Sequence, residues 1–521
     1  MPAASHRRLA APALALALLS PLPAPAQDSG APMSAIDWLS DSVAMPAAAP
    51  GAGIDEPAVT PGATVDPVAV APLDGGNRPD AIGILSPAVT GLPANLWGSS
   101  GAEDLARRVR ALAPDMLPAL QALLYTILLA ELDPPVAPGG KDDTLFLARV
   151  DKLLELGALD QANALLERAG PDKPEIFRRW FDVALLIGEE QALCETMAGT
   201  PDLSPTYQAR IFCLARAGDW TGASLLLGTG SALGLIPEDD ADLFARFLDP
   251  DLFEGEAPLP LPLNPSPLTF RMFEAIGDAI PTAGLPLAFA QTDLLPSAGW
   301  KARIEAGERL ARTGAVSDNQ LLGLYTERRP AASGGVWDRV AAIQALEANM
   351  AANHHAGTAA ALPAAWAALQ EARVEVPIAR IHGAALAGMA LDGEAGRIAF
   401  HMGLLSDSYE TVALAAVPDT PLDSLLAAIA QGSPGIAPAP DARSAAVQGG
   451  FAAAGAPVRL ASLVDSGRLG EAILRAMTLL SEGASGDLDQ VTDALALLRA
   501  VGLEDTARRT ALEFLILDRR G

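Results

Sequence analysis

Few residues in this sequence could carry covalent or metal chemistry. The chain has 521 residues but only two cysteines, Cys194 and Cys213, and five histidines. The cysteines lack the Cys-x-x-Cys spacing of a redox pair, so we do not expect redox catalysis. His354 and His355 are adjacent, and adjacent residues on a helix point in different directions, so a solvated helix end explains them better than a metal site. Because no His-Glu-x-x-His, P-loop or Gly-x-Ser-x-Gly motif occurs, we expect no metal and no cofactor.

Carboxylates are the remaining candidates for chemistry. Two acidic clusters, 239–242 and 487–489, lack the ligand spacing of an EF-hand calcium loop, and each is better explained as the cap of the helix that follows it. A pair such as Glu254 and Glu371 could act as acid and base in an envelope enzyme or ligand-binding protein acting on cell-wall glycans. Nothing in the sequence places these two residues near each other, so this function remains the alternative to a non-enzymatic one.

The clearest pattern in the sequence is the regular spacing of apolar residues and glycines in predicted helices, which would position any functional side chains. Three helix-turn-helix units follow one another between Asp143 and Gly228. Within each unit, apolar residues recur at helical spacing, and the first helix ends at a glycine, where a left-handed residue is favoured. Successive glycines are 31 and 30 residues apart, at Gly157, Gly188 and Gly218. This regularity predicts a repeat architecture.

The units resemble tetratricopeptide-type repeats, whose period is about 34 residues. In that family the glycine is followed by a large residue two positions later and by a small residue five positions later, where the two helices touch. Segments 157–162 and 218–223 fit this pattern, whereas Gly188 reaches its alanine one residue early. The pattern returns at 467–472 and, more loosely, at 502–507. The resemblance implies an all-α fold, an α-solenoid of helix-turn-helix repeats.

A solenoid of this kind offers a long concave surface to protein partners. We predict that four aromatic residues of the repeat block line that surface, although residues at helical spacing more often belong to the core: Trp180, Phe181, Tyr207 and Trp220. Cys194 and Cys213 fall on neighbouring helices of successive units. An oxidising compartment would permit a disulfide between them, and the sequence leaves open whether it forms.

The first 26 residues have the features of a cleaved secretory signal peptide. Arg7 and Arg8 form a basic start, residues 9–19 an apolar run, and residues 24–26 a small-x-small cleavage site. The apolar run is too short to span a bilayer comfortably, and no later stretch is long enough. No cysteine follows the cleavage site, which argues against a lipid anchor. We expect a periplasmic or secreted protein with no membrane span.

The composition is strongly acidic. The chain has 36 Lys and Arg against 63 Asp and Glu, a net charge of −27, and removal of two arginines with the signal peptide gives 34 − 63, or −29. This charge argues against nucleic acid and against anionic lipid headgroups as partners. The simplest explanation of the negative charge is that it keeps the protein soluble. The functional explanation is that it forms an acidic groove for a partner with basic segments.

Residues 27–97 are rich in Pro, Ala and Gly and are predicted to form a disordered linker. Residues 34–43 stand out as a short amphipathic motif, which begins with a capping box and carries Ile36, Trp38, Leu39 and Val43. A helix this short is not stable alone, so it either docks on another protein, packs on this chain or has no role. Docking on a partner is the favoured interpretation, because one large apolar residue can dominate a small interface.

The rest of the chain is predicted to form helical blocks separated by Pro-rich linkers. Tetratricopeptide-like repeats occupy 98–250, an Ala-rich helical block 268–430 and C-terminal helical repeats 457–521, with linkers at 251–267 and 431–456. We therefore predict a non-enzymatic periplasmic scaffold that mediates protein–protein interactions in the cell envelope. A structural spacer is the remaining possibility. The sequence shows neither the partner nor the oligomeric state, nor whether the blocks form one continuous solenoid.

Overall fold

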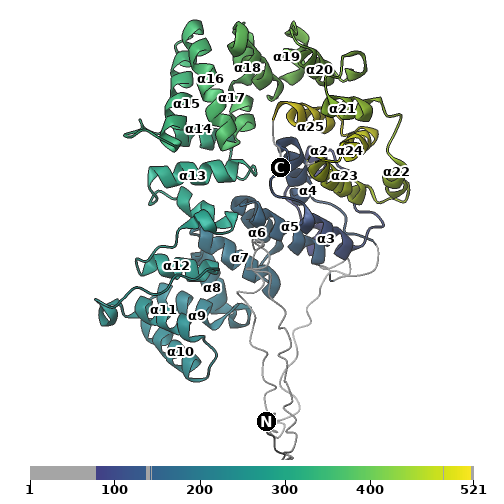
Figure 1. Cartoon of the computed structure of the whole chain (residues 1–521). Helices are drawn as coiled ribbons and strands as arrows, with labels where there is room; N and C mark the ends of the chain where they lie inside the picture. Colours follow the sequence, from purple (N-terminus) through teal and green to yellow (C-terminus); the bar gives the residue numbers. More distant parts are fainter. Residues whose placement is uncertain (1–77, 137–140, 142, 485, 518–521) are drawn as a thin grey trace, which may run out of the picture. The chain divides into compact units, whose positions relative to one another are not determined.

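The computed structural model describes residues 78–136, 141, 143–484 and 486–517. Its regular elements are helices (Figure 1), and the only β pairing in these ranges is an isolated parallel bridge between Leu85 and Ala130. The prediction of an all-α fold is therefore confirmed for this part of the chain. None of the helices described is long and apolar enough to cross a membrane.

The predicted repeat block is built from consecutive helices. Helices α5, α6 and α7 pack in turn, as do α8, α9, α10 and α11, while α7 also packs on α12 of the next block. The elements of this part are η1 (Pro79–Ala81), α2 (Pro87–Thr90), α3 (Ala102–Ala111), α4 (Pro118–Leu129), α5 (Thr144–Glu155), α6 (Leu159–Ala169), α7 (Pro174–Ile187), α8 (Gln191–Gly199), η2 (Pro201–Leu203), α9 (Tyr207–Arg216), α10 (Trp220–Ala232), α11 (Glu238–Leu248) and η3 (Pro250–Phe253).

Glycine ends the helices where the sequence predicts it. Gly157, Gly188 and Gly218 have φ angles of +75°, +80° and +85°, and Gly467 and Gly502 have +71° and +87°. A residue with a Cβ atom is strained in this left-handed conformation, so glycine is favoured there. The prediction that these five glycines terminate helices is confirmed.

The middle and C-terminal blocks are also helical, and one predicted linker is not a linker. Residues 431–456 contain η6 and α21, and the buried Val447 and Phe451 of α21 belong to the core. The elements are α12 (Pro267–Ala275), η4 (Thr282–Gly284), η5 (Leu287–Leu294), α13 (Trp300–Ala311), α14 (Asp318–Thr326), α15 (Val336–Ala351), α16 (His355–Ala372), α17 (Glu375–Gly388), α18 (Gly393–Leu404), α19 (Tyr409–Ala415), α20 (Pro421–Ala430), η6 (Pro434–Ile436), α21 (Ala442–Ala452), α22 (Val458–Asp465), α23 (Leu469–Ala484), α24 (Leu488–Ala500) and α25 (Glu504–Ile516).

The end of the predicted N-terminal linker is ordered as well. Leu96 and Trp97 are fully buried, although the sequence places them in the linker 27–97. They pack on the first turn of α23: the backbone N of Gly470 donates to the Leu96 carbonyl oxygen at 2.9 Å. A Cβ atom added to Gly470 would lie 2.6 Å from the Trp97 ring, so only glycine permits this contact. The prediction of disorder is thus wrong for residues 78–97.

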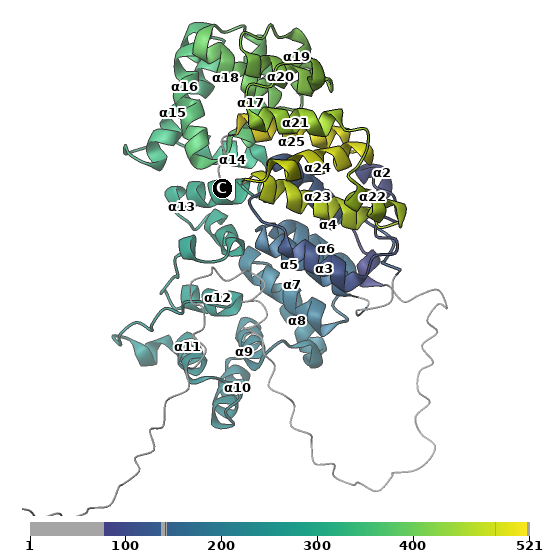
Figure 2. The ribbon, with the colours of Figure 1, turned by 45° about the vertical axis from the view of Figure 1, so that its right-hand side comes forward.

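Helices from opposite ends of the described chain lie side by side. Helix α3 packs on α23 and α4 packs on α25, as both views of the ribbon show (Figures 1 and 2). The backbone N of Ala119, near the start of α4, donates to the Glu513 carboxylate of α25 at 2.8 Å. Helix α4 also contacts the middle block, because the Gln121 side chain donates to the Arg312 carbonyl oxygen at 2.7 Å. Helix α4 therefore contacts both the C-terminal block and the middle block.

Helix α5 carries two cations that are fully buried. The Arg149 guanidinium donates to three carbonyl oxygens, at 2.7 to 2.9 Å, and these belong to Ile82, Leu128 and Ala130. The Lys152 ammonium donates to the Arg110 and Leu112 carbonyl oxygens at 2.9 and 2.7 Å and pairs with Glu155 at 2.5 Å. Buried cations are tolerated only when their donors are satisfied, and here they tie α5 to the segments around it.

Candidate functional site

A cavity in the described part of the chain forms a groove at the C-terminal end of α17. Its volume is about 740 Å³, and its walls come from α17, α18, α19 and the start of α20. Four of its lining residues are alanine or glycine, which occupy little of the space: Ala384, Ala387, Gly388 and Ala399. We call this space the acidic groove, for the charges at its rim.

Glycine also sets how closely the walls of the acidic groove approach each other. A Cβ atom added to Gly383 of α17 would lie 2.2 Å from the Met402 carbonyl oxygen of α18. An added Cβ at Gly396 would lie 2.1 Å from the Leu391 carbonyl oxygen. Both glycines therefore let α18 pack tightly on α17 and the turn between them, which positions the rim residues that follow.

The rim of the acidic groove combines exposed carboxylates with exposed apolar side chains. Asp392, Glu394 and Asp419 are exposed, and Arg397 is the one cation among the lining residues. Val417 also lines the groove and is 88% exposed. Leu414, on α19, is 72% exposed. Val417 therefore adds an accessible apolar side chain to the lining of the groove.

A fourth carboxylate, Asp423, fixes the start of α20 at one side of the groove. Thr420 caps α20 by accepting a hydrogen bond from the Asp423 backbone N at 3.0 Å, and its hydroxyl donates to the Asp423 carboxylate at 2.7 Å. The His401 ring of α18 contacts the same carboxylate at 2.8 Å. Burial raises the pKa of Asp423, but the hydrogen bonds from His401 and Thr420 outweigh it and hold the pKa below its ordinary value. Asp423 therefore adds a negative charge at neutral pH.

The charges of the groove favour a particular kind of ligand. Asp392, Glu394, Asp419 and Asp423 oppose one guanidinium, so the lining has an excess of negative charge. An open cavity lined by small apolar residues and by carboxylates fits a segment that carries aliphatic side chains and lysine or arginine. The Asp423–His401 contact resembles part of a catalytic triad, but the Thr420 hydroxyl donates to Asp423 rather than to His401. This is the arrangement of a helix cap rather than of an activated nucleophile.

The four predicted residues of the N-terminal motif, Ile36, Trp38, Leu39 and Val43, lie outside the described residues. The other four aromatic residues lie in the repeat block and do not gather on one surface. They differ in how deeply they are buried.

Two of these aromatic residues belong to the core or are anchored to it. Phe181 is only 2% exposed and stacks on Phe177 at a ring separation of 6.5 Å. Trp180 is partly buried, and its indole N–H donates to the Asn163 side chain of α6 at 2.8 Å. Phe181 is thus a core residue with an edge on a small cavity, and Trp180 links two helices. Neither offers a broad surface to a partner.

Tyr207 and Trp220 are more accessible. Tyr207 begins α9 and is partly buried against the core. Trp220 begins α10, is 49% exposed and lies against Phe247 of α11 at a ring separation of 6.0 Å. Of the four aromatic residues predicted to line the concave surface of the repeat block, Trp220 is therefore the most exposed to solvent.

Cys194 of α8 and Cys213 of α9 form a disulfide, with their Cα atoms 5.1 Å apart. The bond joins the second helix of one predicted unit to the first helix of the next. It supplements the packing of α8 on α9.

The carboxylate pair of the enzymatic alternative does not form a site. Glu371 lies at the end of α16 and pairs with Arg339 at 3.5 Å, whereas Glu254 follows η3 and is exposed. No contact between the two is present in the described residues. Across the same residues, no group of three or more His, Cys, Asp or Glu side chains could hold a metal ion.

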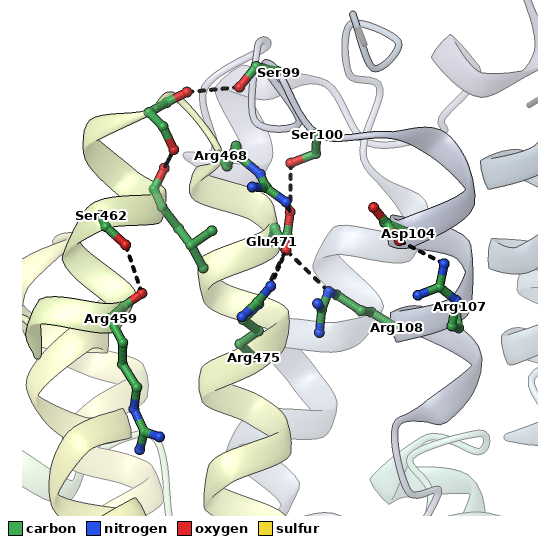
Figure 3. A network of polar contacts seen from close by, with 12 residues as sticks. Ser99, Ser100, Asp104, Arg107, Arg108, Arg459, Ser462, Arg468, Glu471 and Arg475 are labelled. Carbon is green, nitrogen blue, oxygen red and sulfur yellow. Dashed lines mark hydrogen bonds and ion pairs between the residues drawn. The ribbon is translucent and has the colours of Figure 1, made fainter. Parts of the chain in front are cut away.

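A second concentration of charge lies where α3 meets α23, around the fully buried Glu471 (Figure 3). Arg468 and Arg475 each donate two hydrogen bonds to its carboxylate, and Arg108 of α3 approaches it at 3.4 Å. The Ser100 hydroxyl also donates to it, at 3.3 Å. We call these five residues the Glu471 cluster. Because one carboxylate holds three arginines from two distant segments, the cluster joins α3 to α23.

The sequence did not reveal the acidic groove or the Glu471 cluster. The groove lies in the predicted Ala-rich block 268–430, where alanine and glycine indicate close helix packing but not an open cavity. Its one local signal is Val417-Pro418-Asp419, in which an apolar residue and a carboxylate flank a helix-breaking proline. The Glu471 cluster unites residues more than 350 positions apart, which no local pattern reports.

We compared the chain with known proteins. No protein-family model, curated protein sequence or solved structure matches it.

Proposed function

We propose that this chain is a non-enzymatic scaffold that binds protein partners through the acidic groove. The observation that carries the proposal is the composition of the groove: a cavity of about 740 Å³ lined by small residues, an exposed Val417 and several carboxylates. Such a surface suits a partner segment with aliphatic and basic side chains. An excess of negative charge would also speed the encounter with that segment and select against acidic ones.

The architecture we propose is an α-solenoid of tetratricopeptide-like units. Its support is the glycine spacing, the left-handed conformation at all five glycines and the packing of consecutive helices α8, α9, α10 and α11. Solenoids bind proteins along extended surfaces built from many helices, so a groove formed by four successive helices is in keeping with this architecture.

The compartment we propose is the periplasm, and the partners are proteins of the cell envelope. Residues 1–26 support export, because they combine a basic start, an apolar run and a small-x-small cleavage site. The disulfide between Cys194 and Cys213 is compatible with an oxidising compartment.

The groove can be tested with a charge reversal. We expect the mature protein to bind a short Leu/Lys peptide more tightly than its Leu/Glu counterpart. Replacing Glu394 and Asp419 together by lysine should weaken binding of the Leu/Lys peptide about tenfold or more, because two attractive charges become repulsive. Isothermal titration calorimetry at low and high salt measures the effect, which should shrink as salt screens the rim charges.

A matched control separates the groove from the net charge of the protein. Glu103→Lys with Asp202→Lys changes the net charge equally, at exposed positions on α3 and η2. This control should bind the Leu/Lys peptide as the wild type does. Equal loss in both double variants would show that the peptide responds only to total charge and would refute the groove as the binding site.

We further propose that the motif 34–43 is a second docking element, for a partner in the envelope. Its support is the sequence alone: one large aromatic residue, Trp38, within a short amphipathic segment. In-cell crosslinking with mass spectrometry should show one defined partner in the wild type and in Ser40→Ala, and loss of that partner in Trp38→Ala. An unchanged crosslink pattern in Trp38→Ala would rule out docking through Trp38.

A further inference from the structure

A second cavity, distinct from the acidic groove, lies where α4, α13, α14 and α17 meet. Its volume is about 330 Å³. Helix α17 takes part in both sites: Arg380 near its start lines this cavity, and Gly388 at its end lines the acidic groove. We call this space the arginine cavity.

The charge of the arginine cavity is opposite to that of the whole chain. Three arginines line it, Arg312, Arg373 and Arg380, against one carboxylate, Asp318. The lining is therefore positive in a protein whose net charge is −27. Cations gathered in a half-enclosed space repel one another, and a bound anion would offset that repulsion.

The arginines of the cavity are held by different elements. The Arg312 Nε donates to the Ala372 carbonyl oxygen at 2.8 Å, which fixes the guanidinium at the end of α13. Burial lowers the pKa of Arg312; the carboxylate of Glu308 opposes this shift, and the charge of Arg373 adds to it. Arg380 is only loosely paired, since its Nη1 lies 3.6 Å from the Asp318 carboxylate.

The side chain of Tyr125 also lines the arginine cavity. The Tyr125 hydroxyl of α4 is buried and has no hydrogen-bond partner among the described residues. Burial raises the pKa of Tyr125, so the hydroxyl keeps its proton and remains a donor at neutral pH. A buried donor without an acceptor is costly, and a bound acceptor would remove that cost. A Cβ atom added to Gly314, whose φ is +72°, would lie 3.4 Å from the Tyr125 ring, so the Gly314 backbone is close to this side chain.

We infer that the arginine cavity binds a small solute through a carboxylate or phosphate group. Guanidinium groups donate paired hydrogen bonds to such oxyanions, and the Tyr125 hydroxyl can donate another. Arg380 reaches the anion by leaving its weak contact with Asp318. The site would make the junction of α4 with the middle block depend on a bound anion, because an anion that binds only the folded chain stabilises it.

Calorimetric titration of the mature protein with citrate and with inorganic phosphate, at constant ionic strength set by sodium chloride, tests this inference. Binding of one citrate per chain identifies a carboxylate site and binding of one phosphate identifies a phosphate site, and either result supports the inference. Arg380→Gln should weaken binding about tenfold, the usual effect of losing one charge-assisted hydrogen bond. Tyr125→Phe should weaken it several-fold without changing any charge. Asp318→Asn should tighten it several-fold, because it removes the competing carboxylate.

The matched control is Arg459→Gln on α22, since Arg459 also pairs with an aspartate, Asp493, but lies away from the cavity. It should bind the anion as the wild type does. Failure of both anions to bind the wild type at millimolar concentration, or equal weakening by Arg459→Gln and Arg380→Gln, would overturn the inference. Tyr125→Phe and Asp318→Asn keep the test decisive if Arg380→Gln does not fold. The outcome is independent of peptide binding to the acidic groove.

Discussion

Replacing Arg149 by methionine should lower the free energy of unfolding by about 4 kcal/mol, the largest loss we expect from a single substitution in this chain. Methionine matches the aliphatic stem of arginine but ends short of the guanidinium, so most of the loss comes from the polar groups that the guanidinium contacts. Three carbonyl oxygens, those of Ile82, Leu128 and Ala130, lose a donor in a region without solvent. Each unsatisfied buried acceptor costs about 1–3 kcal/mol, although partial relaxation will recover some of it.

A nearby carboxylate adds to the effect of losing Arg149. Asp80 is 2% exposed and accepts a hydrogen bond from the backbone N of Phe146, at the start of α5, at 2.7 Å. Burial raises the pKa of Asp80 to about 6, and the charge of Arg149 acts in the opposite direction. Without Arg149 the ionised carboxylate is less stable at neutral pH, which weakens its contact with α5.

Urea-induced unfolding followed by far-ultraviolet circular dichroism measures the loss in Arg149→Met. The matched control is Arg107→Met, because the Arg107 side chain is 72% exposed and pairs only with Asp104 of its own helix. An exposed pair contributes at most about 1 kcal/mol, so the control should stay close to the wild type. A loss below about 1 kcal/mol in Arg149→Met would show that the three carbonyl contacts do not support the fold.

The helix boundaries could be predicted from the sequence because their causes are local. Gly157, Gly188 and Gly218 mark helix ends by their own backbone preference, whatever lies around them. The spacing of apolar residues likewise predicts α5, α7 and α9 without knowledge of tertiary contacts. Residues that connect distant segments of the chain do not show their role in the local sequence.

Residues whose role depends on distant partners could not be predicted. The composition around Trp97 indicates disorder, yet this residue is buried because a glycine 373 positions later leaves room for its ring. Arg149 has the sequence context of an exposed helical arginine, and only the carbonyl oxygens around it make its burial possible. The acidic groove is open because α17 and α18 meet through glycines, and sequence does not show which faces of two helices meet. The sequence predicts Trp180 and Phe181 as surface aromatics, although residues at helical spacing more often belong to a core.

The second large effect is expected at Glu471, where substitution by glutamine should lower the free energy of unfolding by about 2 kcal/mol. The buried carboxylate is the only negative charge within the Glu471 cluster, and its loss leaves Arg108, Arg468 and Arg475 close together without compensation. The expected loss is smaller than for Arg149 because the arginine side chains are 31–38% exposed and can be partly hydrated. Added salt should reduce the difference between variant and wild type, since it screens the repulsion.

The pH dependence of the Glu471→Gln effect identifies its electrostatic origin. Burial raises the pKa of Glu471, but hydrogen bonds from Arg475 and Arg468 outweigh it and hold the pKa below the ordinary value of 4.5. A carboxyl group with a lowered folded pKa contributes stability above its unfolded pKa and loses it as the pH falls through the folded one. Wild type and Glu471→Gln should therefore differ at neutral pH and converge in acid, as judged by urea unfolding at several pH values. Glu410→Gln is the control, since Glu410 is 57% exposed and pairs with one arginine, Arg508. A difference that persists unchanged in acid would mean that Glu471 acts through packing, and that charge does not join α3 to α23.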